Sequence, residues 1–248
     1  MSGAARTEQV LPWIAPESPS PAGDGVASAE AVQRILSDIT RGALGPGTKL
    51  KVRELKERYG ISATPLREAL SQLAARGFVL LEDRKGFSVP PVSLEELTDL
   101  SSSRQIVEGE ALRLAIAHGD AAWEGHLLSY LHQLKREIER RDTASREWQD
   151  NYERQHRLFH RALISACPYG TLTDFCESLY IKMTRYRRLL KERGFAEHIG
   201  NGAHDPIVDA ALSRNSDLAV PLLREHINVP ASVMKKYLRE DEIARRRR

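Results

Sequence analysis

The sequence predicts a mainly α fold in two parts: three helices with a small hairpin, followed by an all-α helical bundle. Two observations carry this prediction. Apolar residues recur at helical spacing over nearly the whole chain. Strand-like segments, by contrast, occur only near residues 78–89, around a turn that ends in glycine. A chain of 248 residues, of which 41% are hydrophobic and 29% charged, is long enough for two such domains.

Composition divides the chain into four segments. Residues 1–24 contain four prolines among Ala, Ser and Gly, which predicts a flexible tail. We expect the first domain over residues 25–92, the second over 93–240 and a basic tail over 241–248. The first domain carries 11 Lys and Arg against 7 Asp and Glu, so it favours a polyanionic partner.

The first domain is predicted to contain three helices and a hairpin. Helical spacing begins at Ser28, which is the expected N-cap, and ends at Gly42. A short charged helix follows over residues 50–59, and a third runs from a first turn containing Pro65 to a stop at Gly77. The segments 78–81 and 87–89 are expected to be strands.

Three helices followed by a two-stranded wing are typical of a winged helix-turn-helix, whose third helix enters the major groove of DNA. Polar groups at the starts of the second and third helices can donate to phosphates or base edges: Arg53, Ser62, Thr64 and Arg67. The alternative is a winged-helix interaction domain without DNA affinity, in which these residues form a solvated face.

The remainder is predicted to be all-α, with helices near 94–118, 121–141, 146–167, 171–192, 204–214 and 217–239. No repeat of fixed period is present, which favours a closed bundle over a solenoid. We expect most of the basic residues at 185–188 to face solvent. Cys167 and Cys176, the two cysteines, are expected to be reduced packing residues.

Four histidines of the second domain are candidate metal ligands. His156 and His160 are four residues apart, so a helix places both imidazoles on one face. A bundle can bring His204 and His226, from later helices, to the same interior point. The other four are expected to be surface or hydrogen-bonded histidines: His118, His126, His132 and His198.

Several segments of the first domain resemble the N-terminal domain of GntR-family bacterial transcription regulators. They are GALGPGTKL at 42–50, ISATPLREAL at 61–70, GFVLL at 77–81 and the wing glycine Gly86. In that family the residues matching Arg53, Thr64, Arg67 and Gly86 contact operator DNA, and the resemblance implies this role here. Many members carry a basic residue where this chain has Ala63, so one family contact is expected to be absent.

The second domain is similar to the FCD ligand-binding domain of the FadR-type branch of that family. The resemblance rests on Arg104, Phe159-His160, His204 and Arg224-Glu225-His226. It implies a divalent metal in a helical bundle, with a small carboxylate effector completing its coordination. Arg104 would then clamp the carboxylate, because a guanidinium binds one bidentately. The alternative is a surface arginine on a long helix.

One ligand departs from that pattern. The usual first ligand is an aspartate four residues before the Phe-His histidine, and this chain has His156 there. A fourth imidazole removes one negative charge, which favours zinc or nickel over magnesium or calcium. A weaker likeness is to the glutarate-sensing branch, whose members also read His-x-x-Phe-His, and it makes glutarate a candidate effector.

These observations predict a cytoplasmic, homodimeric transcription regulator, expected to be a repressor, that binds double-stranded operator DNA and responds to a small organic acid. The main alternative is a metal-dependent enzyme with a His-rich site. The sequence argues against an enzyme, because no glutamate lies between His156 and His160 and no GxGxxG, GKS or GxSxG motif is present. No apolar run approaches the roughly 20 residues that span a bilayer, so no membrane partner is expected.

Overall fold

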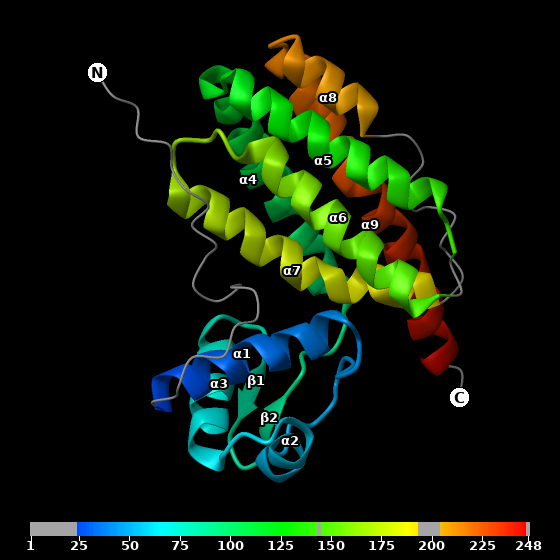
Figure 1. Ribbon diagram of the computed structural model, residues 1–248. Helices are drawn as coiled ribbons and strands as arrows, with labels where there is room; N and C mark the ends of the chain where they lie inside the picture. Colours follow the sequence, from blue (N-terminus) through cyan, green and yellow to red (C-terminus); the bar gives the residue numbers. More distant parts are fainter. Residues whose placement is uncertain (1–23, 143–144, 193–203, 247–248) are drawn as a thin grey trace. The chain divides into compact units, whose positions relative to one another are not determined.

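The computed structural model describes residues 24–142, 145–192 and 204–246, which form nine α-helices and one two-stranded sheet (Figure 1). The predicted mainly α fold class is confirmed. The chain divides into two compact units, Met1–Pro91 and Val92–Arg248. The expected N-terminal tail lies outside the described residues except for Asp24, as does His198. None of the helices in the described ranges is long and apolar enough to span a membrane.

The first unit is a three-helix cluster with a hairpin. Its elements are α1 (Asp24–Thr40), α2 (Val52–Tyr59), α3 (Ala63–Ala75), β1 (Leu80–Glu82) and β2 (Gly86–Ser88). Helix α1 packs against α3, and the apolar stripe predicted for α3 forms the centre of this core, because Leu66, Leu70 and Leu73 are fully buried. Burial of this stripe leaves the opposite side of α3 exposed to solvent.

A tight turn joins α2 to α3. Gly60 ends α2 in the left-handed conformation, with φ 69°, and its N–H donates to the carbonyl of Lys56. A residue with a Cβ adopts this backbone only at a cost, so glycine suits the position. Helix α3 begins two residues after Ile61, which completes the helix-turn-helix arrangement that the sequence predicts.

Two predicted boundaries in the first unit are wrong. Helix α1 begins at Asp24, four residues before the expected cap, and Ser28 is buried inside it, where its hydroxyl accepts a hydrogen bond from Gln72. The first strand begins at Leu80 rather than at Phe78. The N–H groups of Phe78 and Val79 donate to the carbonyl of Leu73, so these two residues close the end of α3 and enter the core instead of pairing in the hairpin.

The second unit is the all-α bundle. Its helices are α4 (Leu94–His118), α5 (Ala121–Glu139), α6 (Arg146–Ile164), α7 (Gly170–Glu192), α8 (Asp205–Leu212) and α9 (Ser216–Arg246). Side chains of Ser93, Asp120 and Ser145 cap α4, α5 and α6 by accepting the N–H of the third helical residue. Helix α9 runs beyond the expected end near residue 239, so most of the predicted basic tail is helical.

Packing in this unit centres on α4, which lies against two other long helices. Helix α4 packs against α7 and α9, and α6 runs alongside α5 (Figure 1). Gly109 allows α4 to approach α9 closely, because a Cβ there would lie 3.2 Å from Val220 Cγ1. Phe159 on α6 is fully buried next to the predicted histidines, and it anchors that face of α6 in the core.

Candidate functional site

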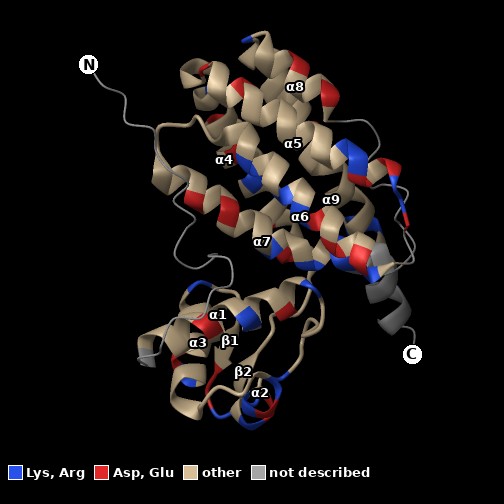
Figure 2. Cartoon of the chain, in the orientation of Figure 1, with Lys and Arg blue, Asp and Glu red and all other residues tan. Residues whose placement is uncertain are grey.

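The residues predicted to contact DNA all lie on the surface of the first unit. The side chains or backbone are exposed at each of the five positions: Arg53, Ser62, Thr64, Arg67 and Gly86. Ser62 is the N-cap of α3, and its hydroxyl makes no capping bond, so it remains available to a partner. Within the described residues neither Arg53 nor Arg67 is paired with a carboxylate. Figure 2 shows the positive charges of α2 in blue.

The hairpin that would form the wing turns through two residues with positive φ. Gly86 has φ 79° at the start of β2, and Arg84 has φ 63° in the turn. The strands pair antiparallel, with Leu81 opposite Phe87. Glycine at position 86 adopts this backbone without strain, which explains why a glycine ends the polar turn.

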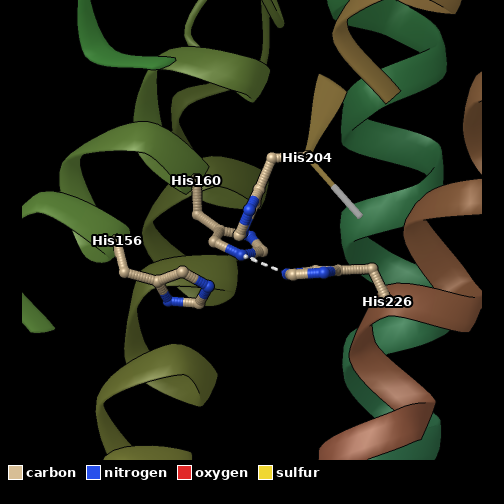
Figure 3. A group of neighbouring side chains, drawn as sticks. All are labelled: His156, His160, His204 and His226. Carbon is tan, nitrogen blue, oxygen red and sulfur yellow. Dashed lines mark hydrogen bonds between the residues drawn. The ribbon is translucent and has the colours of Figure 1, made fainter. Parts of the chain in front are cut away.

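The four predicted metal-ligand histidines come together inside the second unit. His156 and His160 lie on α6, His204 immediately precedes α8, and His226 lies on α9. One ring nitrogen of each lies within 4.8 Å of those of the other three. The four rings point toward a common centre, and a dashed line joins His160 Nε2 to His226 Nε2 at 3.2 Å (Figure 3).

Burial keeps these imidazoles neutral. Loss of hydration disfavours the charged form, and it lowers the pKa of His204 to about 3 and the pKa of His156, His160 and His226 below the ordinary value of 6.5. The neighbouring imidazoles lower the pKa of His156, His204 and His226 further. A neutral imidazole has the lone pair that a metal requires, so the cluster is already in its metal-binding protonation state.

Arg104 and Glu108 lie beside this cluster on α4. Arg104 is only 4% exposed, so it is not the surface arginine of the alternative, and it forms a 2.5 Å ion pair with Glu108. Glu108 Oε2 also lies 3.4 Å from His160 Nδ1. Burial alone would raise the pKa of Glu108, but the charge of Arg104 and the hydrogen bonds from Arg104 and His160 outweigh it and hold that pKa at about 2.

Tyr180 on α7 contacts the other end of the cluster. Its hydroxyl lies 2.6 Å from His156 Nδ1. The guanidinium carbons of Arg104 and Arg187 lie 5.1 Å and 4.2 Å from the centroid of its ring, within the range of cation–π attraction. Arg187 is in turn held by Glu153, at 3.0 Å.

The expectation that most of the basic residues at 185–188 face solvent is wrong. Arg185 and Arg187 are buried and Arg188 is half-buried. Each pairs with a carboxylate from another helix: Arg185 with Glu96, Arg187 with Glu153 and Arg188 with Asp150. Because the partners lie on α4 and α6, α7 can turn its basic side chains inward without leaving their charges uncompensated.

The cluster fits a divalent metal ion. His204 Nε2 is buried and has no hydrogen-bond partner, and an ion would satisfy it. The facing Nε2 atoms of His160 and His226 can both offer lone pairs only if a positive charge lies between them. All four donors are imidazoles, which suit zinc, nickel or copper better than magnesium or calcium.

Known proteins resemble both units. Residues 27–89 match the family of bacterial regulatory proteins named gntR, and residues 99–229 match the FCD domain. The HTH-type transcriptional regulator BphR of Paraburkholderia xenovorans is 37% identical over 225 residues, which are 90% of this chain and 92% of that protein. The chain is a GntR-family regulator with an FCD domain.

Other proteins similar to this GntR-family regulator are transcription regulators as well. The HTH-type transcriptional repressor GlaR of Escherichia coli is 32% identical over 85% of this chain and 97% of its own length. The solved structure of E. coli McbR/YncC has the same fold, with a TM-score of 0.71 at 23% identity over 85% of this chain and 98% of its own. The relatives are transcription regulators, and the enzyme alternative is therefore set aside.

Two residues of the regulator's histidine site, Glu108 and Tyr180, were missed from sequence, and a third, Arg187, belongs to the basic group at 185–188 of which most were expected to face solvent. The sequence spacing could have predicted Glu108, since it lies four residues after Arg104 and therefore on the same face of α4. Spacing could not predict the contacts of Tyr180 and Arg187, because their partners His156 and Glu153 are 24 and 34 residues away on another helix. The other described histidines, His118, His126 and His132, are exposed as expected.

Proposed function

We propose that this GntR-family regulator is a homodimeric repressor controlled by a small carboxylate effector. The predicted domain of residues 25–92 binds double-stranded operator DNA, and the predicted domain of residues 93–240 carries the effector and metal site and the dimer contacts. The convergence of four histidines, three buried and one half-buried, with a ring nitrogen of each within 4.8 Å of those of the other three, is the observation that carries the sensor part of this proposal. The exposed polar start of α3 supports the DNA-binding part.

On operator DNA, helix α3 lies in the major groove. Ser62, Thr64 and Arg67 line its exposed start, where a hydroxyl reaches phosphate and a guanidinium reads the acceptors of guanine. Arg53 at the start of α2 adds a phosphate contact, and the exposed backbone at Gly86 lets the wing approach the DNA closely. A homodimer presents two such helices to a pseudopalindrome.

In the second unit His156, His160, His204 and His226 hold a divalent ion, for which we propose zinc or nickel. When bound, such an ion supplies a Lewis-acidic centre that accepts a carboxylate oxygen of the effector. Arg104 binds the same carboxylate through its guanidinium fork. Glutarate is the first effector to test, because both of its ends are carboxylates of the kind that this site recognises.

The Arg104–Glu108 pair supplies a route from effector to helix movement. An effector carboxylate competes with Glu108 for Arg104, and Glu108 is then free to strengthen its contact with His160. This exchange alters the contact between α4 and α6, and the resulting shift in the bundle re-spaces the two recognition helices of the dimer. Operator affinity therefore falls when the effector binds.

Elemental analysis of the purified protein tests the metal site. We expect about one equivalent of zinc or nickel per chain in the wild type, loss of the metal in His160→Ala, and retention in His132→Ala, whose histidine is exposed on α5. The DNA release caused by glutarate, measured by fluorescence anisotropy, should disappear in His160→Ala while operator binding persists. A His160→Ala protein that still responds to effector would contradict the metal-linked mechanism.

Salt dependence separates this proposal from a winged-helix domain that binds only protein partners. Binding to random duplex DNA should weaken steeply between about 50 and 200 mM salt, because each phosphate contact releases counterions. No detectable binding at the lower salt concentration would overturn the DNA-binding proposal and leave the metal proposal standing.

A further inference from the structure

We propose that Tyr180 is a positioning residue of the metal site, where its hydroxyl accepts the Nδ1–H of His156 and so directs the Nε2 lone pair of His156 to the ion. The inference rests on the metal site proposed above. It adds to that site a residue outside the four histidines.

The hydrogen bond between Tyr180 and His156 is short and is shielded from solvent. Tyr180 Oη lies 2.6 Å from His156 Nδ1, and both side chains are buried, so water does not compete for either group. The hydrogen bond engages one nitrogen of the His156 ring, and the ring itself points toward the other three histidines (Figure 3). Only Nε2 is then left to serve as the ligand of His156.

A histidine ligand needs this kind of partner more than a carboxylate does. A neutral imidazole carries its proton on either nitrogen, and the tautomer with the proton on Nε2 has no lone pair for the ion. An acceptor at Nδ1 stabilises the productive tautomer and fixes the orientation of the ring. A carboxylate oxygen has no such alternative form, so it is the imidazole of His156 that needs the acceptor that Tyr180 supplies.

The two ligands on α6 receive separate outer partners. His160 Nδ1 faces Glu108 Oε2 on α4 at 3.4 Å, whereas His156 Nδ1 faces the hydroxyl of Tyr180 on α7. Carboxylates and neutral oxygen acceptors both serve this purpose in metal sites. Helices α4 and α7 therefore each supply a partner that orients one of the two imidazoles of α6.

The position of Tyr180 is itself fixed by neighbouring charges. The guanidinium carbons of Arg104 and Arg187 lie 5.1 Å and 4.2 Å from its ring centroid. Arg187 is anchored by Glu153 and by the hydroxyl of Thr184, at 3.0 Å and 2.9 Å. Cation–π attraction to two anchored guanidiniums holds the phenol ring, so its hydroxyl reaches His156 in a defined direction.

Zinc affinity tests this role through Tyr180→Phe, which keeps the ring and removes the hydroxyl. Competition against a chromophoric zinc chelator should show binding that is about 10- to 100-fold weaker than in the wild type, the usual cost of losing such a partner. Tyr186→Phe is the matched control, because Tyr186 is a buried tyrosine on the same helix whose hydroxyl bonds to Glu96 instead. Its zinc affinity should be unchanged.

Two further measurements distinguish positioning from a general structural effect. The visible absorption bands of the cobalt(II)-substituted protein should change in Tyr180→Phe and not in Tyr186→Phe, because they report the ligand geometry. In a His156→Ala background, Tyr180→Phe should cause no further loss of zinc affinity, since the ligand that it positions is gone.

Three outcomes would overturn the proposal. Wild-type zinc affinity in Tyr180→Phe would refute the role of Tyr180 and leave the metal site standing. An equal loss of affinity with or without His156 would assign Tyr180 to general stability. A wild-type protein that takes up no zinc would instead refute the metal site itself, and the role of Tyr180 with it.

Discussion

Arg104 and Glu108, one turn apart on α4, form an ion pair of 2.5 Å from which solvent is almost entirely excluded. The same carboxylate lies 3.4 Å from His160 Nδ1, so one glutamate joins the arginine expected to bind effector to a histidine expected to bind metal. A second pair on the same helix, Arg113 and Glu110, is about half exposed. The two pairs offer a direct comparison of buried and exposed ion pairing.

Removal of Arg104 should destabilise the second unit strongly. Arg104→Met leaves the Glu108 carboxylate buried without its main partner, and breaking a buried pair in this way costs about 3–5 kcal/mol of unfolding free energy. Arg113→Met, the control, should leave that free energy almost unchanged, because solvent replaces the exposed partner. The unfolding free energies of the two variants are measured by urea unfolding, followed by tryptophan fluorescence, to which the buried Trp123 and Trp148 contribute. Equal stability of the two variants would show that the buried pair contributes little.

Arg67→Ala should abolish sequence-specific DNA binding and leave the metal content unchanged. The exposed guanidinium on α3 is the group best suited to reading guanine, and a bidentate base contact contributes about 1–3 kcal/mol of discrimination. Arg113→Ala removes the same charge from the second unit and should retain specific binding. Gel shifts against operator and random DNA at equal salt give the comparison. Unchanged specificity in Arg67→Ala would remove Arg67 from the base-reading set.

Replacement by alanine should have opposite effects on stability at two glycines of the second unit. At Gly119 a Cβ would lie 2.1 Å from Trp123 Cε3, and Trp123 is buried with its indole N–H bonded to the carbonyl of Ala162. Gly119→Ala should therefore cost about 1–3 kcal/mol of unfolding free energy. Gly125 lies in α5 with open space around it. Gly125→Ala should raise the unfolding free energy by about 0.5–1 kcal/mol, because glycine loses more backbone freedom than alanine when a helix forms. Thermal unfolding checks both, and equal shifts in Tm would contradict the clash.

The two cysteines should be inert in the folded protein. Burial raises the pKa of the Cys176 thiol to about 12, so the reactive thiolate is almost absent near neutral pH, and Cys167 is buried as well. Labelling with iodoacetamide at pH 8 should be slow in buffer and should modify both residues in urea. Rapid modification of the native protein would show that this part of the core opens readily.

Local spacing was enough to predict much of this protein. The 3.6-residue periodicity of Leu66, Leu70 and Leu73 indicated α3 and its exposed face, because an amphipathic stripe records which side of a helix is buried. The spacing of His156 and His160 likewise placed two imidazoles on one face of α6. Boundaries such as Phe78 were missed, since a strand-forming residue can instead close a helix when its side chain enters the core.

The sequence by itself determined the fold class, the order of the helices and the residue types that converge on the histidine site. Only the tertiary structure decided which groups surround those histidines. Tyr180 reaches His156 and Arg187 reaches Glu153 across the space between α6 and α7, and the spacing along one helix carries no information about such a contact. Buried charges and imidazoles require partners because water is excluded, and the packing of the helices determines which residues supply them.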